Sequence, residues 1–131
     1  MARKLVRIIL VGDAQAEYGK LEQAVAEEKK KGIPSSFHQT LFRSIQAKFK
    51  ILREHYDYGE QIPRSIIPKK YSIMGATNLW KVDLSGYWRM IYTLRQPARE
   101  GAEIEIMEIF LDVLDIVDHP TYDRMFGYRK K

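Results

Sequence analysis

One arginine in the second half of the chain stands in a run whose alternate residues are apolar. Arg89 lies between Trp88 and Met90. A guanidinium in the middle of a sheet needs a carboxylate, a phosphate or water, because burying an unpaired charge costs much free energy. Arg89 therefore either stabilises negative charge on a phosphate or forms a cross-strand salt bridge, for instance to Asp83 or Glu105.

A histidine and a tyrosine near the C-terminus are the next candidates for chemistry. His119 can act as a general acid or base at neutral pH, because the ordinary pKa of an imidazole lies close to that pH. It can equally be a residue at the start of a helix before Pro120, with Asp118 as a surface partner. Tyr122 can hold an unstacked base on its ring, or it can anchor the core.

The positive charge of the chain predicts a polyanionic partner or, equally well, a solvated and soluble surface. Lys and Arg number 22 against 17 Asp and Glu, which gives a net charge of +5. This excess lies mainly in residues 35–70 and at the tail. Basic side chains can position a nucleic acid through its phosphates without reading its sequence. The candidates for such contacts are Lys50, Arg53, Lys69, Lys70, Lys81 and Arg129.

Several other kinds of chemistry are poorly supported. The chain has no cysteine, which excludes disulfides, thiolate metal sites and cysteine nucleophiles. It lacks a phosphate-binding glycine loop, a nucleophile elbow and an H-E-x-x-H motif. The spacing of Asp112, Asp115, Asp118 and His119 is also typical of one exposed helical or turn face, so we favour neither a metal nor a cofactor. No apolar run reaches the roughly 18 residues that cross a bilayer, and we expect a cytoplasmic protein.

The first half of the chain must supply one strand and two helices. Residues 5–11 have the apolar pattern of a buried strand. Asp13 is a candidate cap for a helix from Ala14 to the lysines before Gly32, with one apolar stripe. Ser36 and Gln39 form a candidate capping box for a second helix, in which Leu41, Ile45, Phe49, Leu52 and Tyr56 share one face. The short link between the helices predicts an antiparallel hairpin.

The second half has the periodicity of strands. Residues 59–70 are expected to be an irregular connector, and the alternation over 79–84, 88–94 and 103–113 predicts an antiparallel meander. A short helix is expected over 121–126. The fold class is therefore α+β, in one domain spanning residues 1–131. The simplest arrangement packs both long helices on one face of a sheet and leaves the opposite face free to bind.

Particular motifs in this order resemble the RelE/ParE superfamily of bacterial and archaeal toxins. They are LWKVDLSGYWRMIYTLR (79–95) and EIFLDVLDIVDHPTYDRMFGYR (108–129), and the pattern VRIILVGDAQAEYGKL (6–21) also suits the opening strand and helix of the family. The hairpin strand of the family carries an aromatic-Arg-x-x-Tyr core, matched here by residues 88–92. A basic or histidine residue followed by an aromatic comes after its last strand, matched here by His119 and Tyr122.

The resemblance implies the toxin component of a type II toxin–antitoxin system. Such a toxin is a metal-independent endoribonuclease that cleaves mRNA on the ribosome and is neutralised by an antitoxin wrapped around it. It also implies that Arg89 stabilises the transition state, that His119 is the acid or base, and that Tyr122 positions the substrate. The expected partners are thus a cognate antitoxin, in a hetero-oligomer, together with mRNA and the ribosome.

The C-terminal segment departs from the best-known members of the family. Those place an arginine, often with a lysine nearby, after the last strand, whereas this chain has Asp115, Asp118 and His119 there. The histidine resembles the YafQ-like branch, while the aspartates make a phosphate pocket less positive. A non-catalytic binding protein of the same fold is therefore the alternative, either a gyrase-poisoning ParE-like toxin or an inactive toxin homologue.

Overall fold

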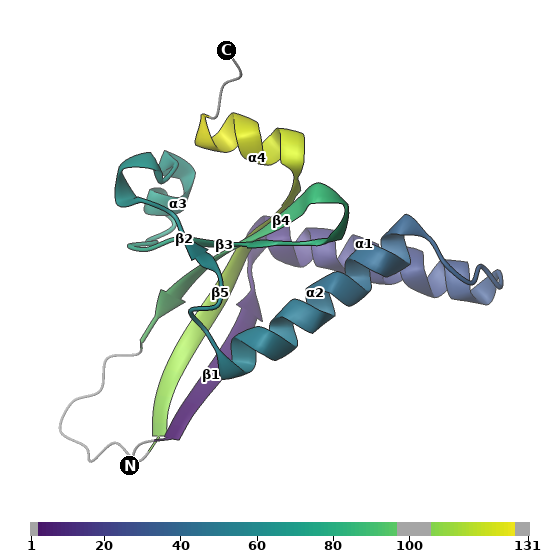
Figure 1. The fold of residues 1–131 in the computed structure, drawn as a ribbon, viewed down its shortest axis with the longest axis horizontal. Coiled ribbons are helices and arrows are strands. Elements are labelled where there is room, and N and C mark those ends of the chain that lie inside the picture. Colours follow the sequence, from purple (N-terminus) through teal and green to yellow (C-terminus); the bar gives the residue numbers. More distant parts are fainter. Residues whose placement is uncertain (1–2, 97–105, 128–131) are drawn as a thin grey trace.

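The computed structural model describes residues 3–96 and 106–127, and Figure 1 shows how their helices and strands follow one another. The class is α+β, as predicted. The main elements are β1 (Arg3–Leu10), α1 (Gly12–Lys30), α2 (Phe37–Glu54), β2 (Glu60–Gln61), α3 (Lys69–Ile73), β3 (Trp80–Asp83), β4 (Trp88–Arg95), β5 (Ile106–Asp118) and α4 (His119–Phe126). Two 3₁₀ turns, η1 (Arg64–Ile66) and η2 (Ser85–Tyr87), complete the order.

The sheet is mixed, with the strand order β1-β5-β4-β3-β2. The predicted strands β3, β4 and β5 pair antiparallel in chain order. The sheet as a whole is nevertheless not a simple meander, because β1 pairs parallel with β5 and β2 adds to the far edge. The N-terminal strand thus forms one edge of the sheet, next to the last strand. No local pattern in the sequence indicates this pairing.

Strand β5 continues to Asp118, so the expectation that the strand ends at Val113 is wrong. A bulge lets β5 continue its pairing with β4 beyond Val113. Asp115 lies opposite Ile91 and Val113 lies opposite Tyr92, so Leu114 has no residue opposite it. Asp112, Asp115 and Asp118 are consequently strand residues and do not line one helical or turn face.

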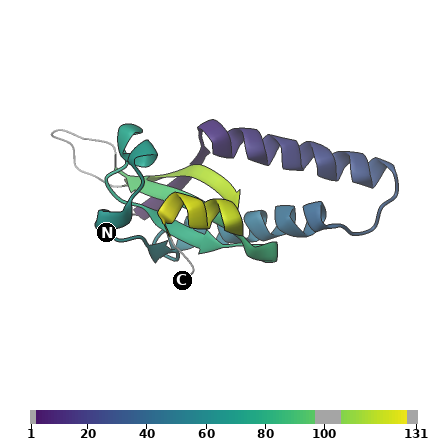
Figure 2. The ribbon, with the colours of Figure 1, turned by 90° about the horizontal axis from the view of Figure 1, so that it is seen from above.

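Helices α1 and α2 form the expected hairpin and cover one face of the sheet, as Figure 2 shows from above. Their apolar stripes meet the sheet in a first core cluster, which includes Leu21, Leu41, Ile45, Phe49, Leu52, Met90, Tyr92, Leu111, Val113 and Ile116. Ser36 caps α2, because its hydroxyl accepts the backbone N–H of Gln39 at 3.1 Å. Asp13 does not cap α1, since that helix already begins at Gly12 and has no side-chain cap.

The opposite face of the sheet is not free, contrary to the prediction. A second core cluster covers it, formed by Ile62, Tyr71, Leu79, Ile91, Leu114, Tyr122 and Phe126. These residues come from α3, α4 and the segment before β3 as well as from the sheet. The connector 59–70 also holds a short strand, a 3₁₀ turn and the start of α3, and so is not wholly irregular.

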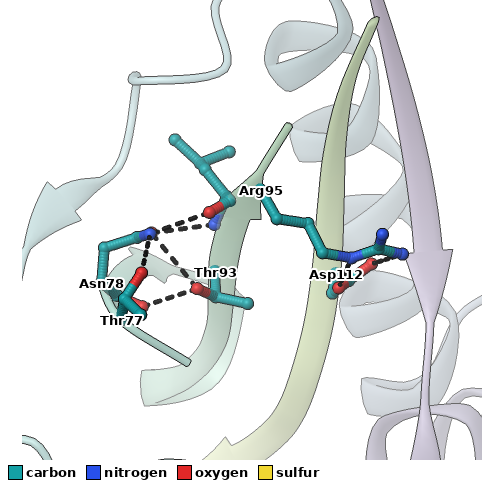
Figure 3. A network of polar contacts seen from close by, with 6 residues as sticks. Thr77, Asn78, Thr93, Arg95 and Asp112 are labelled. Atoms are coloured by element: carbon teal, nitrogen blue, oxygen red, sulfur yellow. Dashed lines mark hydrogen bonds and ion pairs between the residues drawn. The ribbon is translucent and has the colours of Figure 1, made fainter. Parts of the chain in front are cut away.

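The start of β3 is fastened to the end of β4 by the side chain of Asn78, shown in Figure 3. Its Nδ2 donates to the carbonyl of Leu94 at 2.8 Å, and its Oδ1 accepts the N–H of Leu94 at 2.8 Å. The Asn78 amide therefore takes the place of a backbone partner in the ladder. Its Oδ1 also accepts Trp80 Nε1 at 3.1 Å, which orients the indole.

Replacing Asn78 tests this fastening. Asn78→Ala removes both hydrogen bonds to Leu94 and leaves that partly buried backbone without them, so we expect a loss of about 2–3 kcal/mol in unfolding free energy. Urea denaturation followed by tryptophan fluorescence measures it. The control Gln46→Ala, on the exposed face of α2, should change stability by less than about 0.5 kcal/mol. Equal stability of the two variants would show that Asn78 is dispensable.

Candidate functional site

Two cations and a carboxylate meet on the α4 side of the β3–β4 hairpin, and Lys81 Nζ also lies 3.2 Å from Oε2 of Glu60 on β2. Arg89 pairs across the strands with Asp83 in the ladder, and Lys81 pairs with Ile91. Asp83 Oδ1 lies 3.2 Å from Arg89 Nε and 3.2 Å from Lys81 Nζ. The cross-strand salt bridge to Asp83 that the sequence allowed for Arg89 is thus present. Its other possible partner, Glu105, lies outside the described residues.

Both cationic side chains are largely buried, whereas the carboxylate between them is not. The side chains of Lys81 and Arg89 are each 16% exposed, and that of Asp83 is 67% exposed. Arg89 Nε has no hydrogen-bond partner even though Asp83 Oδ1 is within ion-pair distance, because the N–H is not directed at that oxygen. The two converging cations and the exposed carboxylate make this cluster a candidate anion site.

The residues before and within α4 place His119 beside this pair. Asp118 caps the helix, since its Oδ1 accepts the N–H of Thr121 at 2.9 Å. Hydrogen bonds from the side chain and backbone of Thr121 lower the pKa of Asp118. Pro120 suits the first turn because its missing N–H would have no partner there. Gly127 ends the helix in the left-handed conformation with φ +70°.

His119 contacts both a carboxylate and the guanidinium. Its Nε2 lies 3.1 Å from Asp123 Oδ2, and its Nδ1 lies 3.4 Å from Arg89 Nη2. The arginine can only donate, so this network assigns the proton to Nε2 and the lone pair to Nδ1. The side chain of His119 is 46% exposed. Asp118 is a helix cap, and Asp123 rather than Asp118 is the acidic partner of the histidine.

Tyr122 forms the floor of the cluster. It is 2% exposed, and its ring stacks on Phe126 with 4.4 Å between the centroids. The Arg89 Cζ atom lies 5.3 Å and Lys81 Nζ 5.9 Å from the centroid of the Tyr122 ring. Such cation–π contacts hold both cations in place. A direct catalytic role for Tyr122 stays a prediction, and the structure places it as a core residue beneath the cations.

The other predicted contact residues within the described part of the chain do not join this cluster. Lys70 Nζ lies 2.8 Å from Asp115 Oδ2. Lys69 is exposed on α3, while Lys50 and Arg53 are exposed on α2, the helix that covers the other face of the sheet. Arg129 lies outside the described residues. The structure therefore unites Arg89, Lys81, His119 and Tyr122, and it leaves Lys50, Arg53, Lys69 and Lys70 apart from them.

Asp115 belongs to a buried network rather than to the site. It is 4% exposed and accepts the hydroxyl of Tyr71 at 2.6 Å. Burial, and then the bond to Asp115, raises the pKa of Tyr71 above its ordinary value, so this phenol keeps its proton and donates it. Asp112 instead pairs with Arg95 at 2.6 Å. The aspartates of β5 thus each have a separate structural partner.

Sequence analysis missed Tyr87, which lies beside His119. The two rings are 6.5 Å apart between centroids and 54° from parallel. Tyr87 is 78% exposed. The signal in the sequence is weak, because it consists of a single aromatic residue next to the Ser85-Gly86 turn.

Residues 3–96 and 106–127 contain neither a candidate metal-binding cluster nor a helix that could span a membrane. No group of three or more acidic or histidine side chains there could hold a metal ion. No helix in the same residues has the length and apolar character needed to cross a membrane.

No protein-family model matches this chain. Neither the curated proteins nor the solved structures give a significant match. Any proposal for the function of the chain therefore rests on the geometry of the cluster and on its sequence motifs.

The cap of α4 predicts a pH-dependent contribution to stability. Because the folded pKa of Asp118 is lowered, its cap is fully effective above the unfolded value of about 3.9 and is lost as pH falls through the folded value. We expect Asp118→Ala to lower the unfolding free energy by about 1 kcal/mol near neutral pH. In urea denaturation measured from pH 7 to pH 2.5, this difference should shrink towards the acid end.

The matched control is Asp118→Asn, which keeps an N-cap oxygen without a titrating group. The difference in unfolding free energy between Asp118→Asn and Asp118→Ala should not shrink with falling pH, because neither variant has a titrating group at this position. A loss caused by Asp118→Ala that persists undiminished at pH 2.5 would contradict the role of the carboxylate.

Proposed function

We propose that this chain is the toxin component of a type II toxin–antitoxin system, a metal-independent endoribonuclease that cleaves mRNA on the ribosome. The observation that carries the proposal is the contact of Arg89 Nη2 with His119 Nδ1 at 3.4 Å, at a half-exposed imidazole. It joins a group that can move a proton to a group that can stabilise a phosphate.

The geometry supports a direct displacement within the RNA chain. Once Arg89 Nη2 turns from His119 Nδ1 to the phosphate, Nδ1 takes the proton from a ribose 2′-hydroxyl, and the 2′-oxygen attacks the adjacent phosphorus. The new P–O2′ bond replaces the P–O5′ bond, and the 5′-oxygen leaves with a proton from water. The products are a 2′,3′-cyclic phosphate and a 5′-hydroxyl end. Arg89 and Lys81 stabilise the extra negative charge on phosphate in the transition state.

Two residues position these groups. Asp123 accepts from His119 Nε2 and so keeps the lone pair on Nδ1. The ring of Tyr122 contacts the Arg89 and Lys81 side chains and restricts their rotamers. Each cation therefore loses less conformational entropy when it binds a phosphate. The cations occupy a partly desolvated surface, where their interaction with a phosphate is stronger than in water.

The order of elements agrees with this proposal. A strand, two helices, antiparallel strands and a terminal helix follow one another as expected for RelE/ParE toxins. A RelE-like arrangement, a wrapped antitoxin and action on ribosomes in the cytoplasm are parts of the proposal. Of the predicted RNA contacts in residues 3–96 and 106–127, Lys81 is the one beside the reacting groups.

The proposed roles predict a large loss of activity on truncation. Arg89→Ala and His119→Ala should each reduce ribosome-dependent mRNA cleavage about 100-fold or more, because the first removes charge stabilisation and the second removes the base. Cleavage in a translation extract is measured by mapping 5′ ends, and growth arrest in an expressing host is the second readout.

Matched controls separate these effects from the loss of a surface charge. Arg43→Ala on the exposed face of α2 and His55→Ala after α2 replace the same residue types away from the cluster, and both should retain full activity. If the double variant of Arg89 and His119 arrests growth as strongly as the native chain, the proposed roles are wrong.

The ion pairs of Asp83 favour a second candidate function. A carboxylate that already neutralises Arg89 and Lys81 is what a structural salt bridge requires. The chain would then be a non-catalytic binding protein of the same fold. Inhibition of DNA supercoiling with intact mRNA would indicate a gyrase-poisoning toxin, and the absence of both effects would indicate an inactive homologue.

Asp83→Asn distinguishes the two candidates. If the cations bind phosphate, removing this negative charge should strengthen binding of a single-stranded RNA about fivefold at low salt, the equivalent of roughly 1 kcal/mol of repulsion near a surface. Fluorescence anisotropy with a labelled oligonucleotide measures this. Glu22→Gln on α1 removes an exposed negative charge elsewhere and should have little effect. Unchanged or weaker binding by Asp83→Asn would favour the structural salt bridge.

A further inference from the structure

Tyr87 has an unfavourable backbone conformation at an exposed position. Its φ is +63°, and it is the only non-glycine residue with positive φ in the described part of the chain. The left-handed region costs an ordinary residue free energy, because its Cβ approaches the following carbonyl oxygen. Glycine or asparagine would fit this turn more easily, yet an aromatic side chain stands here with its surface open to solvent. Strain of this kind is often found at functional sites.

The loop that carries Tyr87 is held firmly against α2. A Cβ on Gly86 would lie 2.5 Å from Cε1 of Phe37, so only glycine lets that ring pack against the loop. The Ser85 N–H donates to Ser44 Oγ at 3.0 Å, and the Leu84 N–H donates to the carbonyl of Trp88 at 2.8 Å. These contacts leave the loop little freedom to relax. The ring of Tyr87 is therefore presented in a defined place beside α4.

That place adjoins the cluster on its solvent side. The Tyr87 ring lies 6.5 Å from the imidazole of His119, which in turn contacts Arg89. Tyr87 and Arg89 thus both lie beside the same imidazole, Tyr87 from the η2 turn and Arg89 from β4. An exposed aromatic face thus stands next to a proton acceptor and a phosphate-binding cation.

We propose that Tyr87 is the platform on which an unpaired base of single-stranded RNA stacks next to the phosphate at Arg89. This rests on the proposed function and assigns a residue to its substrate site. The ring of Tyr122 is 2% exposed and lies beneath the cations, so it offers no open face on which a base could stack. Stacking on an aromatic ring tolerates any base, so Tyr87 contributes affinity and register rather than strict sequence preference.

The test measures binding of a single-stranded RNA that cannot be cleaved. A fully 2′-O-methylated oligonucleotide containing 2-aminopurine reports both affinity, by anisotropy, and stacking, by the change in base fluorescence. We expect Tyr87→Ala to weaken binding about 10- to 100-fold and to abolish the fluorescence change. Tyr87→Phe keeps the ring and should restore both within about twofold.

A second variant separates the ring from the fold. Tyr87→Gly relieves the positive φ, so it should unfold at an equal or higher urea concentration than the native chain while binding RNA as weakly as Tyr87→Ala. Salt dependence separates stacking from charge. Lys81→Ala should reduce the slope of log affinity against log salt by about one, whereas Tyr87→Ala should leave that slope unchanged.

The outcomes distinguish this proposal from the proposed function. Ile73→Ala, which truncates another highly exposed apolar side chain, should bind RNA like the native chain. If Tyr87→Ala binds like the native chain, or if the native chain does not bind the oligonucleotide, the platform is refuted. Ribosome-dependent cleavage that requires Arg89 and His119 would still stand in either case. If cleavage does not depend on Arg89 and His119 but the base still stacks on Tyr87, the catalytic roles are refuted and the chain is an RNA-binding protein.

Discussion

Strand β5 has one residue more than the stretch of β4 that it pairs with, and the resulting bulge at Leu114 decides which side chains lie on each face of the sheet. Val113 and Ile116 enter the first core cluster, and Leu114 enters the second. Strict alternation from Val113 would instead direct Asp115 into the core beneath α1 and α2. A carboxylate without partners there would be very unfavourable.

The bulge places Asp115 where Tyr71 and Lys70 can satisfy it. This contact ties α3 to the sheet and completes a second core that Tyr71, Phe126 and Tyr122 dominate. The floor of the candidate site is therefore a product of the bulge, because Tyr122 has a fixed place only when that core is packed. Arg89 and Lys81 lie on the ring of Tyr122, and His119 reaches Arg89 from the start of α4.

The same cluster forms structural ion pairs and would also serve the proposed function. Asp83 compensates Arg89 and Lys81 when no other anion is present, which removes the cost of holding two cations close together. Because Asp83 is exposed and its pairing is screened by water, the bond is weak and readily exchanged. A phosphate can supply more acceptor oxygens in its place. The strained loop that Phe37 and Ser44 hold in place presents the exposed ring of Tyr87 beside this cluster. The ion pairs do not depend on that ring.

Much of the fold follows from local patterns in the sequence. The apolar stripes of α1 and α2, the cap at Ser36, the β3–β4 turn and the terminal helix were all predicted, because each depends on residues close together in the chain. Arg89 and His119 could be singled out for the same reason. Their residue types are conspicuous in an apolar strand and next to a helix start.

The tertiary structure alone decided the rest. The parallel pairing of β1 with β5, the bulge, the covered second face and the burial of Tyr122 depend on residues far apart in the sequence. Tyr87 became a candidate only through its backbone conformation and its distance from His119. The sequence by itself determined the α+β class and the residue types available for chemistry. Long-range pairing and packing decided which of them meet, because a side chain's neighbours across a sheet are not set by its neighbours along the chain.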